Sequence, residues 1–163
     1  MSTEPDIASF LAKYSPEIAA QLRGARAKLQ ALFPQGFELV YDNYNALVFC
    51  FGPTDRASDA ILSVAGYPRW ITLFFAKGRL LQDPDGLLQG TGSIIRSIRL
   101  GAPADLDRPE VRALIDQAIH PQLPALTAAP PLRTLLKSIS ARQRPRRQPE
   151  RTPHSHRNQK GRY

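Results

Sequence analysis

Apolar positions in the first third of the chain recur at helical spacing. The runs 4–14 and 18–33 each carry one apolar stripe, with charged residues mostly on the other sides. Between them lies Ser15-Pro16-Glu17, in which serine suits a helix cap, proline the first helical position and glutamate the helix dipole. A proline follows the second run. The pattern therefore predicts two consecutive helices.

The period then shortens to that of β-strands, and the apolar runs become brief and rich in aromatic and β-branched residues. The connections between them are too short for a parallel crossover, which indicates a mostly antiparallel meander of about five strands. A last helix is expected over 110–119. Helices at both ends of a meander predict an α+β fold, with the N-terminal and C-terminal helices packed on the same face of the sheet. The expected strands are 37–41, 46–51, 60–66, 69–75 and 93–100.

Composition divides the chain into a domain and a tail. Residues 1–120 form the predicted α+β domain, and 121–131 are rich in proline and read as a linker. Residues 132–139 read as a short amphipathic segment with leucines at helical spacing. No Ile, Leu, Val, Met or Phe follows, so 140–163 cannot bury enough apolar surface to fold and are predicted to be disordered.

The net charge of +8 comes almost entirely from the C-terminal end. Residues 133–163 hold ten lysines and arginines and one acid, Glu150. Such a segment suits contact with phosphate groups in nucleic acid or another polyanion; the alternative is a solvated tail with no dedicated partner. The candidate polyanion-binding residues of the tail are Arg142, Arg144, Arg146, Arg147, Arg151, Arg157, Lys160 and Arg162.

Several classes of protein are disfavoured by what the sequence lacks. No run of about 18 apolar residues is present to span a membrane, and acids occupy the place where a signal peptide carries bases. The lone cysteine, Cys50, forms no internal disulfide, and its apolar neighbours predict a buried, inert thiol. A cytoplasmic protein without membrane contact, cofactor or catalytic constellation is expected.

The stretch 82–101 is glycine-rich and raises the question of a phosphate or metal loop. It lacks the lysine and spacing of a Walker loop, the GxGxxG fingerprint and the closing glutamate of an EF-hand. Asp-Pro-Asp-Gly at 83–86 matches a type I turn at every position. The alternative is a backbone anion site that uses glycine amides together with Lys77, Arg79 or Arg96.

Amphipathic aromatic residues supply a second candidate site. Tyr41, Asp42, Tyr44 and Trp70 combine rings with polar groups, as the walls of small-ligand pockets do. The competing interpretation places Tyr41 and Trp70 in the core and Tyr44 in a hairpin turn. The sequence leaves both interpretations open.

Four stretches resemble the YdhG-like domain family, a bacterial family of unknown function: 36–61, 67–100, 108–119 and 135–147. The resemblance implies an α+β fold with an antiparallel sheet and flanking helices. Some members of this family are linked to frataxin-like handling of intracellular iron, and the family supplies no catalytic residues to transfer.

The leading hypothesis is a non-enzymatic binding domain whose basic tail engages nucleic acid or another polyanion. The alternative is an iron-binding chaperone, for which the sequence offers only Asp83 and Asp85 as weak metal ligands. A third hypothesis, a small enzyme that uses carboxylates around Asp42 and Trp70, has the least support.

Overall fold

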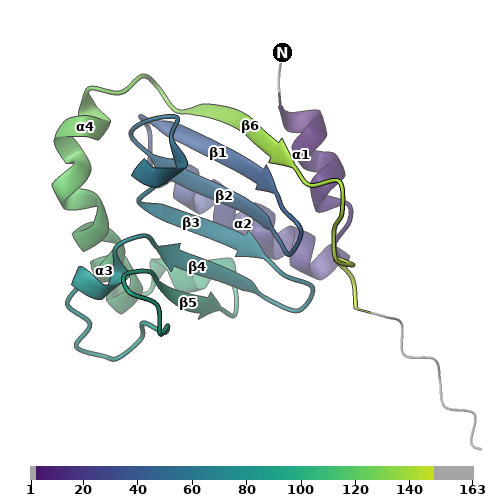
Figure 1. The fold of residues 1–163 in the computed structure, drawn as a ribbon. Helices are drawn as coiled ribbons and strands as arrows, with labels where there is room; N and C mark the ends of the chain where they lie inside the picture. Colours follow the sequence, from purple (N-terminus) through teal and green to yellow (C-terminus); the bar gives the residue numbers. More distant parts are fainter. Residues whose placement is uncertain (1–2, 149–163) are drawn as a thin grey trace, which may run out of the picture.

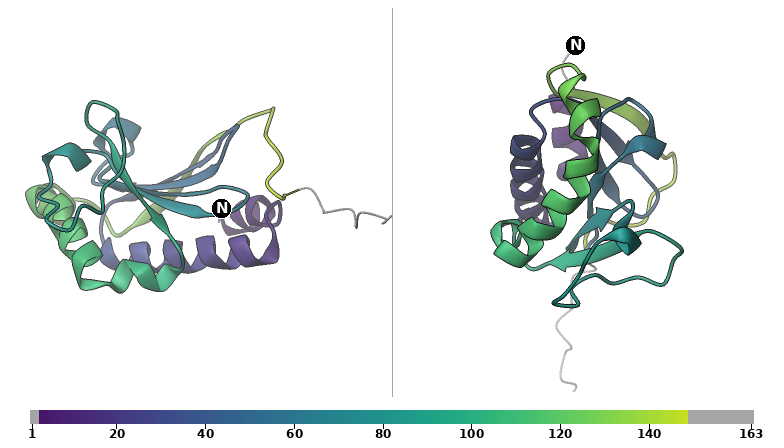
Figure 2. Two further views of the ribbon diagram at one scale, coloured as in Figure 1. Left: turned by 90° about the horizontal axis from the view of Figure 1, so that it is seen from below. Right: turned by 90° about the vertical axis from the view of Figure 1, so that its left-hand side faces the viewer.

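The protein is described by a computed structural model for residues 3–148, which form one six-stranded sheet with helices along one side (Figures 1 and 2). The first five strands form the predicted antiparallel meander, and the sixth joins its first edge, giving the order β5-β4-β3-β2-β1-β6. The fold is therefore α+β with a mostly antiparallel sheet. The strands are β1 (Phe37–Asp42), β2 (Leu47–Gly52), β3 (Leu62–Gly66), β4 (Ile71–Phe75), β5 (Arg96–Leu100) and β6 (Arg133–Ile139).

The three expected helices are present in the predicted order, and a short fourth helix was not predicted. Ser15 caps the second helix through a hydrogen bond from the Ile18 amide, as predicted. The second helix lies over the middle of the sheet, whereas the third packs beside it through a 3₁₀ turn, at the end of the sheet rather than over its centre (Figure 2). The helices are α1 (Glu4–Leu11), α2 (Pro16–Leu32), α3 (Pro109–Ile119) and α4 (Leu123–Thr127), with 3₁₀ turns η1 (Ala57–Asp59), η2 (Gly78–Leu80), η3 (Pro103–Asp107) and η4 (His120–Gln122).

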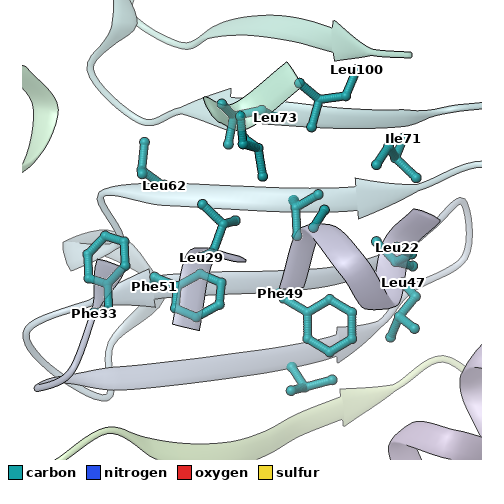
Figure 3. Packing of buried hydrophobic residues seen from close by; sticks show 14 of the residues in the cluster. Leu22, Leu29, Phe33, Leu47, Phe49, Phe51, Leu62, Ile71, Leu73 and Leu100 are labelled. Carbon is teal, nitrogen blue, oxygen red and sulfur yellow. The ribbon is translucent and has the colours of Figure 1, made fainter. Parts of the chain in front are cut away.

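The core lies between the sheet and the helices. Alternation along β2 points Leu47, Phe49 and Phe51 toward α2, where they meet Leu22 and Leu29 (Figure 3). No α-helix among residues 3–148 lies along the opposite face of the sheet (Figure 2). Helices on one face only explain why the strand pattern alternates instead of being apolar throughout.

The segment predicted as short and amphipathic at 132–139 is the edge strand β6, which pairs in parallel with β1. Leucines at 132, 135, 136 and an isoleucine at 139 mimic a helical stripe, but a bulge opposite Val40 and Tyr41 shifts the register and reconciles the pattern with a strand. The expected linker 121–131 contains η4 and α4, which carry the chain from the β5 edge to the β1 edge. The pairing of β6 with β1 joins residues that are far apart in sequence, so no local pattern predicts it.

The beginning of the predicted disordered tail is also ordered in the structure. Residues 140–148 run from β6 across the end of the sheet to the α1–α2 turn, where Arg147 donates to the Ala12 carbonyl. We call 140–148 the strap. Hydrogen bonds to backbone carbonyls and a buried ion pair hold it there, interactions that composition does not reveal. Residues 149–163, including Arg151, Arg157, Lys160 and Arg162, lie outside the described residues.

Candidate nucleic-acid interface

Two hairpins and the strap meet at one end of the sheet, the right-hand end in Figure 1. The β1–β2 and β3–β4 turns are neighbours because Leu47 pairs with Gly66. The strap begins beside them because Ile139 pairs with Asp42. We call this the aromatic–arginine end, which comprises Tyr44, Tyr67, Trp70, Arg99 and Arg144.

Trp70 and Arg99 form the first aromatic–guanidinium pair. The Arg99 guanidinium lies 3.8 Å from the centroid of the Trp70 ring. The centroid of the Tyr67 ring, in the same β3–β4 turn, lies 6.2 Å from the centroid of the Trp70 ring. Trp70 and Tyr67 are half-buried, whereas Arg99 is exposed. Trp70 is thus not a core residue, as one interpretation held, and its role in a small-ligand pocket stays a prediction. Arg99 was not singled out by the sequence, because only β4–β5 pairing brings it to Trp70.

Tyr44 forms the second pair. Its side chain is 48% exposed at the tip of the β1–β2 turn. The Arg144 guanidinium lies 5.6 Å from its ring centroid, and the Arg144 amide donates to the Tyr44 carbonyl at 2.8 Å. Tyr44 is therefore a turn residue, as one of the two interpretations held, but one with an arginine from the strap beside it.

Asp42 is a structural residue rather than a ligand-binding one. Its side chain is fully buried, and Lys13 donates to Oδ2 at 2.6 Å. Arg146 Nη2 lies 3.0 Å from Oδ1, close enough for an ion pair although the angle is wrong for a hydrogen bond. Arg146 is itself only 3% exposed and also donates to the Tyr14 hydroxyl at 2.6 Å. Arg146 is thus unavailable to a polyanion, contrary to the prediction.

Tyr41 and Cys50 lie on the helix-free face of the sheet, where Tyr41 shares a cross-strand row with Val48, Ala65, Thr72 and Arg99. Both are half-buried, and burial raises the pKa of each group, with the nearby Cys50 adding to the rise for Tyr41. The predicted set Tyr41, Asp42, Tyr44 and Trp70 does not form one pocket, because the Asp42 side chain is buried on the helix-covered side. Successive β1 side chains point to opposite faces, which separates Tyr41 from Asp42.

The glycine-rich stretch is a turn. The Gly86 amide donates to the Asp83 carbonyl, and Gly86 has the positive φ of +64° that favours glycine. Arg96 donates to the carbonyls of Gly92 and Ile95, and Arg79 to that of Ser93. These two guanidiniums organise the loop, which does not support the alternative of an anion site built on them.

Asp83 is likewise occupied by its own loop. Its two carboxylate oxygens accept the amides of Leu87 and Leu88, each at 2.9 Å, whereas Asp85 is exposed. Across residues 3–148, no group of three or more His, Cys, Asp and Glu side chains gathers as a metal-ligand set. The geometry therefore offers the iron-chaperone alternative no site in this part of the chain.

Lys77 is the remaining predicted residue, and it lies at the opposite end of the sheet. It follows β4 and lines a hollow between the sheet and α3. The structure therefore does not bring Lys77 and Arg79 into one site with Tyr44 and Trp70, although each was a reasonable candidate by residue type.

Comparison with protein-family models, with curated proteins and with solved structures finds no match. The resemblance to the YdhG-like family accordingly stays a prediction. Every helix within residues 3–148 is too short or too polar for a membrane span.

Proposed function

We propose that the protein is a non-enzymatic binding protein for single-stranded nucleic acid, which it holds at the aromatic–arginine end. The observation that carries this proposal is the pair of exposed guanidiniums, Arg99 and Arg144, placed beside the rings of Trp70 and Tyr44 at one end of the sheet. Aromatic rings stack on unpaired bases regardless of sequence, and adjacent arginines contact the phosphates.

The charge around these rings favours a polyanion. Arg142 and Arg147 of the strap are exposed, as is Arg69 at the tip of the β3–β4 turn. The Asp42 carboxylate beneath them is buried and paired with Lys13 and Arg146, so it does not offset the exposed arginines. The strap ends at Gln148, and the sequence continues with the basic residues 149–163. Phosphate contacts from that segment would add salt-dependent affinity.

The test uses the single tryptophan of the chain, Trp70, as its own reporter. Titration with a twelve-nucleotide oligo(dT) should quench the fluorescence of Trp70, because a stacked base contacts the indole directly. The dissociation constant should rise steeply between 50 and 200 mM NaCl. Fluorescence anisotropy of a labelled oligonucleotide gives the same constant for variants without tryptophan.

Trp70→Ala should weaken binding by roughly 1–3 kcal/mol, the usual worth of one stacked base. Arg99→Gln and Arg144→Gln should each reduce the salt slope by about one. Arg79→Gln is the matched control, because Arg79 is exposed but lies in η2, after β4 at the other end of the sheet. Two results would show a purely ionic interaction and contradict the proposal. One is an affinity unchanged by Trp70→Ala, and the other is duplex DNA and heparin binding as tightly as the single-stranded oligonucleotide.

A further inference from the structure

A hollow of about 260 Å³ lies at the end of the sheet opposite the aromatic–arginine end. Its walls come from the β2–β3 connection with η1, from the end of β4, and from the α3–η4–α4 segment, which are at the left of Figure 1. These elements are distant in sequence, so only the tertiary structure creates the space.

The inner walls are apolar. Ile61, Phe75 and Leu81 contribute side chains, and Ile61 and Phe75 belong to the buried core. The space exists because small side chains occupy positions where larger ones would fill it. These small residues are Ala60, Ala76, Ala118 and Ala125.

The charged groups of the hollow differ in their contacts, since the Asp59 carboxylate is hydrogen-bonded and ion-paired, whereas Lys77 acts on it only through its charge. The Asp59 carboxylate accepts from the Thr54 hydroxyl at 2.6 Å and pairs with Arg56 at 3.0 Å. The hydrogen bond from Thr54, and then the charges of Arg56 and Lys77, lower the pKa of Asp59. Within residues 3–148, no hydrogen bond or ion pair engages the Lys77 ammonium.

Lys77 also lies where the hollow opens. A wider and shallower groove of about 810 Å³ adjoins the hollow and shares Lys77, Leu81, Ala118 and Gln122 with it. A ligand that enters through this groove would therefore place its apolar body against Phe75 and Leu81 and its anionic group at Lys77.

We propose that this hollow is a binding site for a small aromatic monocarboxylate. An apolar cavity of about 150 Å³ holds benzene, so 260 Å³ accommodates an aromatic ring with a short side chain. One ammonium matches one carboxylate, whereas a phosphate dianion requires several donors. This site is independent of the proposed nucleic-acid interface, since the two lie at opposite ends of the sheet.

The probe is 3-phenylpropionate, titrated into the full-length protein by isothermal calorimetry and by ¹H–¹⁵N NMR. Saturable binding with a dissociation constant at or below about 1 mM is expected, with shifts at the amides of residues 75–77 and 118–122. The neutral analogue 3-phenylpropan-1-ol should bind about tenfold more weakly, because it lacks the charge-assisted contact with Lys77.

Lys77→Met keeps the apolar stem, removes the charge and should weaken 3-phenylpropionate about tenfold. Lys28→Met on α2 is the control and should leave the constant unchanged. Ala118→Leu should fill the hollow and abolish binding, and Ala125→Leu repeats this test at an exposed position in case the first variant is unstable. Equal affinity for the acid and the alcohol, an unaffected Lys77→Met protein, or no saturation by 10 mM would each overturn the proposal.

Discussion

Arg146 sits in a basic, proline-containing stretch and is nevertheless one of the most buried charged residues of the structure. Its guanidinium approaches the Asp42 carboxylate and the Tyr14 hydroxyl, and it also donates to the Asn43 carbonyl. A buried carboxylate that loses one of two cationic partners is costly, because desolvation is no longer offset.

Arg146→Met should therefore lower the free energy of unfolding by about 3 kcal/mol. Urea denaturation followed by circular dichroism measures the change. Arg142→Met is the matched control, since Arg142 is exposed, and should change stability by less than about 0.5 kcal/mol. Equal effects of the two substitutions would mean that Arg146 is not held as the structure has it.

Cys50 provides a prediction that depends on pH. Burial raises the pKa of its thiol, so the thiolate fraction at a given pH is lower than that of an ordinary cysteine. Iodoacetamide should modify Cys50 more slowly in the folded protein than in urea at pH 8, and the rate should keep rising above pH 9. A folded-state rate at pH 8 equal to the rate in urea would exclude the raised pKa.

At the scale of elements, the packing of α2 on β3 depends on a close approach at Gly66. A Cβ at this position would lie 2.6 Å from Leu22 Cδ2 and 3.3 Å from Tyr14 Cζ. Both of these side chains are fully buried and have little room to move.

Gly66→Ala should consequently destabilise the protein by about 1–3 kcal/mol, as overpacking does. Gly92→Ala is the control, because no atom lies within 4 Å of its added Cβ. The melting temperatures of the two variants, measured side by side, give the comparison. A Gly66→Ala protein as stable as Gly92→Ala would show that the helix can move away from the strand at no cost.

For the whole molecule, the structure changes where the tail should be cut. A chain that ends at Ile139 loses the entire strap, including Arg146, and leaves Asp42 with Lys13 as its cationic partner. A chain that ends at Gln148 keeps every strap contact described above. Truncation after 139 thus combines two effects, loss of charge and loss of stability.

We expect truncation after Gln148 to leave the urea midpoint unchanged and to weaken oligonucleotide binding in a salt-dependent way. Truncation after Ile139 should lower the midpoint by an amount similar to that caused by Arg146→Met. If both truncated chains unfold at the midpoint of the full-length protein, the strap contributes nothing to the fold.

Local pattern was sufficient to predict α1, α2 and α3, the five-stranded meander and the turn at 83–86, whereas α4 lies in a stretch expected to be a linker. Helical spacing, strand alternation and turn chemistry are properties of consecutive residues, so neighbouring letters reveal them. The short loops also determined that these strands pair antiparallel, because a parallel crossover needs a longer connection.

Tertiary structure alone decided the features that join distant residues. β6 pairs with a strand nearly a hundred positions away, and Arg146 of the basic tail forms an ion pair with the Asp42 carboxylate on β1. Arg99 meets Trp70, and Lys77 faces α3, for the same reason. A buried ion pair, a stacked guanidinium and a cavity each depend on which surfaces the fold brings within a few ångströms, and that information is absent from the spacing of residues along the chain.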